Sequence, residues 1–193
     1  MSLYIDIHTH NPSGQHIEPT AIGIHPWDAE NGNLAELDFS HAQMVGEIGL
    51  DFACDVDRAR QIAIFEEQLL LAKRLGKPVI LHCVKAFEQT MKILKKYTLQ
   101  AVIFHGFIGS KEQAQQAISE GYYLSFGERT WHSPKTIEAL QITPLDRLFV
   151  ETDEADTTIV KQYLEVTQVK QISLNELQQA ILKNHNRIFN THE

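Results

Sequence analysis

Two histidines near the start of the chain, His8 and His10, follow an apolar run and are separated by one residue. Side chains two apart on a β-strand share a face, so a strand over residues 3–10 points both imidazoles the same way. The neutral imidazole is the commonest metal ligand among protein side chains. The pair therefore predicts half of a metal site, although a short His-x-His pattern is also typical of a histidine pair that only ends a strand.

Further side chains that can bind metal stand at or near the ends of four other predicted strands. They are Glu47 in residues 44–51, His82 in 78–83, His105 in 101–105 and Asp153 in 147–153. Taken singly, each histidine could be satisfied by a backbone carbonyl and each carboxylate by a helix N-terminus or an ion pair. A single metal centre explains all of them together, because the parallel strands of a β/α barrel end at one rim.

The number of these side chains favours two divalent metal ions over one. Four imidazoles and two carboxylates exceed the three protein ligands of a tetrahedral catalytic zinc. In two-metal sites the ions lie about 3.5–4 Å apart and share the activation of the nucleophile and the stabilisation of the leaving oxygen. Glu47 lies in the sequence between the two histidine groups, so we expect it to bridge the metals. Zinc, manganese, nickel and magnesium all remain open.

Strand and helix patterns alternate along the chain, which is typical of a parallel α/β sheet, either a closed barrel or an open doubly wound sheet. Seven strands are predicted, over residues 3–10, 21–27, 44–51, 78–83, 101–105, 122–126 and 147–153. Helices are predicted over residues 57–75, 86–97, 110–119, 134–140, 158–168 and 174–189. A TIM-type barrel normally takes eight strands and about 250 residues. The 193 residues here therefore predict a compact (β/α) barrel that lacks or distorts one β/α unit.

Composition narrows the class of protein. With 43% hydrophobic residues, the chain is expected to form a single domain over residues 1–193. The net charge of −8, without a polybasic run, argues against binding nucleic acid by bulk electrostatics. Cys54 and Cys83 fit neither a disulfide framework nor a Cys-x-x-Cys site, and no targeting or membrane segment is evident. We expect a cytoplasmic monomer that does not bind membranes.

The order of the motifs resembles the TatD family of metal-dependent deoxyribonucleases, within the amidohydrolase-like superfamily. The matching motifs are Asp6-Ile7-His8-Thr9-His10, Gly23-Ile24-His25-Pro26, Gly46-Glu47-Ile48-Gly49, Phe104-His105-Gly106 and Glu151-Thr152-Asp153. The resemblance implies a β/α barrel with two metal ions. It implies that His8, His10, Glu47 and Asp153 hold one ion, and that Glu47, His82 and His105 hold the other.

Two departures from the family pattern concern the substrate. The arginine that usually stands two residues after His82 is replaced by Val84, followed by Lys85. After Asp153 the usual Ala-Pro-Tyr stretch and long loop are missing, and the chain soon enters a helix. We expect His25 and Lys85 to contact the substrate, although His25 could instead orient its loop. Asp51 is expected to orient a metal ligand.

We predict a metal-dependent hydrolase of ester bonds, most simply a deoxyribonuclease that cleaves phosphodiester bonds in the 3′-5′ direction from single-stranded DNA ends. Asp153 would orient or deprotonate the attacking water, and Glu47 would bridge the metals. The first alternative is a small-molecule hydrolase acting on a phosphoester, lactone or amide with the same metals. The second is a barrel that binds metal without turnover. The remaining histidines, His16, His41, His132, His185 and His192, are expected on the surface.

Overall fold

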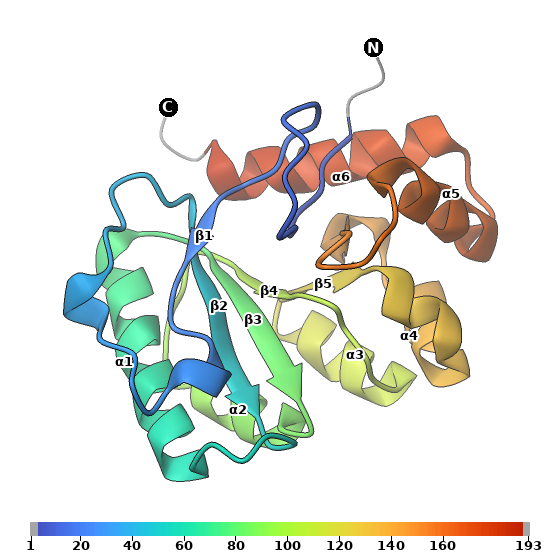
Figure 1. Cartoon of the computed structure of the whole chain (residues 1–193). Coiled ribbons are helices and arrows are strands. Elements are labelled where there is room, and N and C mark those ends of the chain that lie inside the picture. The colour runs from blue at the N-terminus through green and yellow to red at the C-terminus, as the bar shows by residue number, and fades with distance from the viewer. Residues whose placement is uncertain (1–3, 191–193) are drawn as a thin grey trace. The chain divides into compact units, whose positions relative to one another are not determined.

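Figure 1 shows the computed structural model of the protein, which describes residues 4–190. The chain forms two compact units: the central unit, residues 20–104, and the terminal unit, residues 4–19 together with 105–190. Parallel strands alternate with helices in each, so the predicted α/β class is confirmed. The single domain stays a prediction. No helix within residues 4–190 is long and apolar enough to cross a membrane.

The central unit is built on four parallel strands that pair in chain order. They are β1 (Ala21–Ile22), β2 (Met44–Asp51), β3 (Val79–Val84) and β4 (Val102–Phe104). The helices of this unit are η1 (Pro26–Asp28), η2 (Leu34–Glu36), α1 (Arg58–Leu75) and α2 (Phe87–Leu94). α1 packs against β2, and α2 packs against β3 (Figure 1). β2 is buried along nearly its whole length, as expected of a parallel strand covered on both faces.

The long helix α1 begins and ends where the sequence predicts. The Asp57 side chain accepts a hydrogen bond from Arg60 N–H, which satisfies one of the free N–H groups of the first turn. Gly76 adopts φ +60°, a left-handed conformation that glycine tolerates, and this ends the helix. Phe65 and Leu69 are fully buried on one helix face, which anchors α1 on the sheet.

The terminal unit contains the parallel strands β5 (Tyr123–Phe126) and β6 (Leu148–Val150). Its helices are α3 (Lys111–Ser119), η3 (Glu128–His132), α4 (Pro134–Ile142), η4 (Leu145–Arg147), α5 (Ile159–Lys170) and α6 (Leu174–Phe189). Figure 1 shows α5 and α6 as neighbours, and both also contact β6. Phe149 on β6 and Tyr163 on α5 are buried in the core of this unit.

The first predicted strand, residues 3–10, is wrong as a regular strand. Leu3 lies outside the described residues, and residues 4–10 form only isolated bridges, one of which joins Thr9 to Asp153. β6 ends at Val150, so Asp153, expected at a strand end, follows the strand in irregular backbone. The segment still runs extended beside this part of the chain: Asp153 N–H donates to His8 O at 3.0 Å. Ile7 N–H also donates to Val150 O, so the pairing begins where β6 ends and is limited to isolated bridges.

The second predicted strand, residues 21–27, is shortened to β1. Pro26 begins η1, and His25 caps it by accepting a hydrogen bond from Trp27 N–H. Within the described residues there are therefore six strands where seven were predicted. The other predicted strands and all predicted helices are present, with ends that shift by up to three residues.

Candidate functional site

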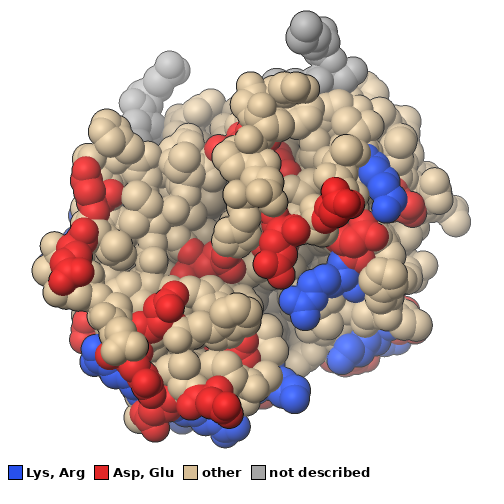
Figure 2. Space-filling model, viewed as in Figure 1, with Lys and Arg blue, Asp and Glu red and all other residues tan. Residues whose placement is uncertain are grey.

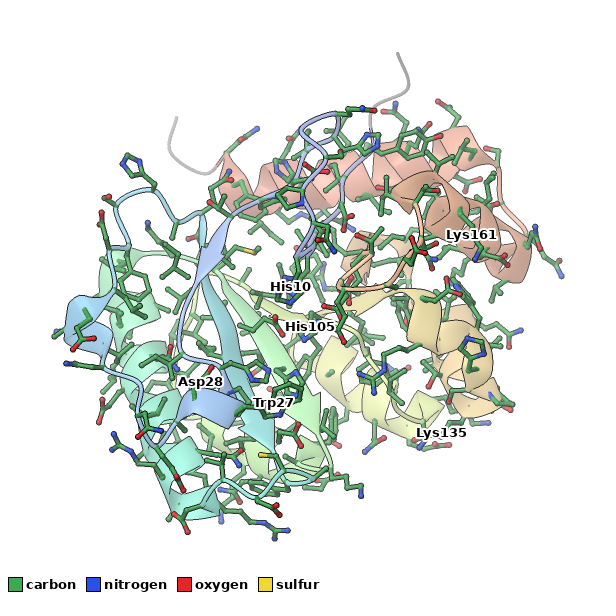
Figure 3. All side chains as sticks on the ribbon, in the orientation of Figure 1. His10, Trp27, Asp28, His105, Lys135 and Lys161 are labelled. Carbon is green, nitrogen blue, oxygen red and sulfur yellow. The ribbon has the colours of Figure 1, made fainter. Side chains whose placement is uncertain are left out.

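Four of the six predicted metal ligands lie in the terminal unit, and the structure brings them together. Oδ1 of Asp153 is 3.6 Å from Nε2 of His8 and 3.4 Å from Nε2 of His10. The ring centroids of His8 and His105 are 4.6 Å apart. His105, Glu151 and Asp153 offer three ligand atoms within 4.8 Å of one another. Figure 3 labels His10 and His105, which project into the same region of this unit.

The extended segment that carries His8 and His10 is held by buried polar contacts. The Asp6 carboxylate accepts hydrogen bonds from Thr152 N–H at 3.0 Å and from Thr152 Oγ1 at 2.6 Å. Burial raises the pKa of Asp6 to about 7, against the lowering effect of these bonds. The Tyr163 hydroxyl donates to Ile5 O and accepts from Ile5 N–H. Asp6 and Tyr163 thus anchor the segment that carries the two imidazoles.

Glu151 is a site residue that the sequence prediction missed. Its side chain is 1% exposed, and its Oε1 lies 3.3 Å from Nδ1 of His105. Burial alone would raise the pKa of Glu151, but the hydrogen bond and charge of His105 outweigh it and hold the pKa below its ordinary value. A charged carboxylate here can orient His105 or bind a cation itself. The sequence feature that could have identified Glu151 as a site residue is its position two residues before Asp153.

The other two predicted ligands, Glu47 and His82, lie in the central unit. Oε2 of Glu47 is 3.7 Å from Nδ1 of His82 and 3.9 Å from Nε2 of His25. These three residues offer ligand atoms within 4.8 Å of one another. His25, expected to contact substrate, therefore stands beside the two ligands of this unit. Gly49, at φ +139°, lets β2 approach the backbone of His82, which any side chain at that position would strike.

Asp51, predicted to orient a metal ligand, contacts His82, and that role stays a prediction. Its Oδ2 lies 3.2 Å from Nε2 of His82 and accepts a 2.7 Å hydrogen bond from Nε1 of Trp27. Burial would raise the pKa of Asp51, but the Trp27 hydrogen bond and further hydrogen bonds, from Ala53 N–H and His82, lower it below its ordinary value. The carboxylate is thus held in its charged form against the imidazole.

Two other predictions concern single side chains. Lys85, the second expected substrate contact, follows β3 with φ +50° and is exposed. It belongs to neither group of candidate ligands, and its role stays a prediction. His185, expected on the surface, is buried at 8% exposure, because it lies on the inward face of α6. His192 lies outside the described residues.

An α/β protein with histidines and carboxylates grouped near its strand ends has the fold and the ligand set of a metal-dependent hydrolase. The family model "TatD related DNase" matches residues 14–190, and the chain belongs to this family. The predicted enzyme class, a metal-dependent hydrolase of ester bonds, is thereby confirmed.

The curated relatives include both unassigned hydrolases and nucleases. The chain is 31% identical to the uncharacterized metal-dependent hydrolase YabD of Bacillus subtilis, over 88% of this chain and 76% of that protein. It is 30% identical to the uncharacterized metal-dependent hydrolase YjjV of Escherichia coli, over the same shares. The 3′-5′ ssDNA/RNA exonuclease TatD of Erwinia amylovora is 35% identical over 68% of this chain and 56% of that protein.

Solved structures agree on the fold. The crystal structure of YjjV from E. coli matches with a TM-score of 0.80 and 28% identity, over 89% of this chain and 76% of that one. A TatD family hydrolase from Entamoeba histolytica matches with a TM-score of 0.81 and 19% identity, over 99% of this chain and 86% of that one. These similarities confirm the predicted TIM-type α/β fold class.

Proposed function

We propose that this protein is a two-metal phosphodiesterase that releases nucleotides from the 3′ ends of single-stranded DNA. The observation that carries the proposal is the grouping of histidines with carboxylates in each unit, His8, His10 and His105 around Asp153 and His25 and His82 around Glu47. Relatives named as single-strand exonucleases support the choice of substrate, but the chain spans only about half of their length. That this chain acts on the same single-stranded substrate is therefore part of the proposal.

The residues present fit divalent metal ions. Several imidazoles lie close together beside carboxylates: the ring centroids of His8 and His105 are 4.6 Å apart, and those of His25 and His82 are 4.4 Å apart. Ring nitrogens and carboxylate oxygens gathered in this way can share a divalent cation. Imidazole nitrogen with carboxylate oxygen suits zinc or manganese, while magnesium prefers oxygen ligands alone. We propose two ions, with the ligand sets expected from the family resemblance and Glu47 as the residue common to both.

The hydrogen bonds select the tautomer of two of these histidines. If Nε2 of His82 donates its proton to Asp51, Nδ1 is left with a free lone pair on the side that faces Glu47. If Nδ1 of His105 donates to Glu151, Nε2 becomes the ligand atom. Each carboxylate thus makes its histidine a better ligand and fixes the plane of the ring.

Metal ions bound here would polarise the phosphoryl oxygen and lower the pKa of water. The role of Asp153 is then to orient the attacking water and to accept its proton, because its carboxylate stands between His8 and His10 and remains partly accessible. Glu47 would act as a metal ligand beside His82. His25, whose Nδ1 already accepts from Trp27 N–H, presents Nε2 toward Glu47 and could serve as a ligand or a substrate contact.

Surface charge supports a second candidate, a hydrolase of small phosphoesters. Figure 2 shows acidic and basic side chains interspersed, and no continuous basic tract crosses either unit on the visible face. With a net charge of −8, a long polyanion would be repelled. DNA cleavage should therefore be slow, limited to single-stranded ends and strongly reduced by salt. Both cysteines are free thiols, which suits the reducing cytoplasm that we propose as its location.

The test begins with the metal content of protein purified without added metal. A 5′-labelled single strand should then be shortened from its 3′ end in the presence of zinc, manganese or magnesium, and a duplex should resist. Asp153→Asn should abolish the release, while Asp156→Asn, at an exposed position three residues on, should not. If no metal supports DNA cleavage but a phosphomonoester, lactone or amide is hydrolysed, the small-molecule reading replaces the nuclease. If the metal-loaded protein hydrolyses none of these substrates, the remaining hypothesis is a barrel that binds metal without turnover.

A further inference from the structure

A cavity of about 300 Å³ opens in the terminal unit beside the candidate ligand Asp153. Its walls are the segment after β6, which carries Glu151, Thr152 and Asp153, and the segment that contains η3. The glycines Gly106 and Gly127 form part of its lining. A Cβ on Gly127 would stand 2.9 Å from the backbone oxygen of Glu151, so the glycine lets these two walls of the cavity approach each other closely. A group bound in the cavity would lie next to the carboxylate proposed to accept the proton.

The η3 wall of the cavity is braced by α5. Nε2 of Gln162 donates a 2.6 Å hydrogen bond to Oε2 of Glu128, and Nζ of Lys161 lies 3.4 Å from the same oxygen. Nε1 of Trp131 donates to Oε1 of Gln162 at 2.8 Å. The hydrogen bond from Gln162 lowers the pKa of Glu128, so this carboxylate is charged and its charge is balanced by Lys161. Figure 3 labels Lys161 on α5.

Arg129, between these braced residues, is the cation that this wall presents to the cavity. It is exposed, and the structure gives its guanidinium no hydrogen bond, ion pair or ring contact within residues 4–190. Arg147 of the same unit differs: it pairs with Asp146 and lies over the ring of Tyr123. An arginine without a protein partner, on a rigid wall, keeps its full set of donors for a ligand. The planar guanidinium fork matches the oxygens of a phosphate.

We propose that this cavity binds the phosphate-bearing terminal nucleotide of the substrate, or a small phosphoester of that size, with Arg129 holding the phosphate. This inference rests on the proposed function, in which the adjoining ligand group cleaves a phosphoester. The cavity is at the small end of ligand-binding pockets, which bounds the bound group to about one nucleotide and excludes a duplex.

The site is tested by equilibrium binding, without turnover. Thymidine 5′-monophosphate and thymidine are titrated into the full-length protein by calorimetry, with and without a chelator. The wild type should bind the monophosphate more tightly than the nucleoside, and Arg129→Gln should weaken only the monophosphate, by about tenfold. Arg129→Lys should recover part of the loss because it keeps the charge without the fork. Lys135→Gln, a change of the same charge on α4 outside the cavity, should leave both affinities unchanged.

Three results would overturn the inference. The wild type could fail to bind the monophosphate at millimolar concentration, Arg129→Gln could bind it as well as the wild type, or Lys135→Gln could weaken it equally. The last result would show that the loss of any positive charge weakens monophosphate binding, whatever its position. Failure of the proposed function looks different: DNA and phosphoesters would not be cleaved, while monophosphate binding would still depend on Arg129. If DNA is cleaved with an unchanged KM by Arg129→Gln, the nuclease stands and this site does not.

Discussion

Oδ2 of Asp51 lies between Nε2 of His82 and Nε1 of Trp27, at 3.2 Å and 2.7 Å. Trp27 is 59% exposed, so it contributes little to the core, and its Nε1–H is held by the Asp51 carboxylate. Asp51 in turn presents its charge to a histidine that is itself nearly buried. The central unit thus has a three-member chain that ends on a candidate metal ligand.

Asp51→Asn should lower the affinity for metal by about 10- to 100-fold, because the carboxylate that orients His82 and raises its basicity is removed. The affinity can be measured by competition with a chromophoric chelator. Trp27→Phe keeps the aromatic ring and removes the N–H, so its effect should be in the same direction and smaller. Equal metal affinity in Asp51→Asn and the wild type would show that His82 is not a ligand or does not depend on Asp51.

Glu151 contacts the ring nitrogen of His105 in the same way as Asp51 contacts that of His82. The same reasoning gives a second prediction. Glu151→Gln keeps the size of the side chain but removes the charge that faces Nδ1 of His105. We expect weaker metal binding, with only a modest fall in the melting temperature of the metal-free protein from loss of the contact with His105. Glu138→Gln, an exposed change on α4, is the matched control for loss of one negative charge. A large fall in the stability of metal-free Glu151→Gln would make the role of Glu151 structural.

Local rules explain which parts of the fold could be predicted. The ends of α1 depend on Asp57 and Gly76. The start of α3 depends on Ser110: its hydroxyl accepts a hydrogen bond from Gln113 N–H, and its own N–H donates to the Gln113 side chain. These signals lie within a few residues of the helix end, so they can be read from sequence. β2 was predicted correctly over Met44–Asp51 because its apolar run is long.

Non-local contacts explain the failures. Residues 4–10 pair through isolated bridges and backbone hydrogen bonds with residues 150–153, which lie some 140 residues away in sequence, at and beyond the end of β6. The predicted site residues that lie close together within each unit, four in the terminal unit and two in the central unit, stand at or near strand ends, which could be located from the sequence. Glu151 was missed because a carboxylate within an apolar strand was counted as part of the strand and its distant partner, His105, could not be known.

The bridging role of Glu47 gives a third prediction. Glu47→Gln should reduce the metal content from two equivalents toward none, because one carboxylate is proposed to serve both ions. Elemental analysis of protein dialysed against metal-free buffer measures this directly. The control is Glu67→Gln, an exposed position on α1 that should retain both equivalents. Loss of a single equivalent in Glu47→Gln would rule out the bridge, and an unchanged count would remove Glu47 from the site.

The last prediction concerns pH and a histidine that is not a candidate ligand. His185 is buried on α6, its ring stacks on Phe189 with centroids 4.6 Å apart, and burial lowers its pKa below 6.5. Below about pH 6.5 the unfolded chain therefore binds a proton at His185 that the folded chain resists. The contribution of His185 to stability is complete above that pH and is lost as the pH falls toward its lowered folded pKa.

His185→Gln should consequently flatten the fall in melting temperature between pH 8 and pH 5.5, measured in chelator so that metal release does not contribute. The comparison is between the two pH slopes, since the substitution also changes stability at every pH. His41→Gln, at an exposed position, should keep the slope of the wild type. If the His185→Gln slope equals that of the wild type, then the neutral form of His185 is not what the folded state requires.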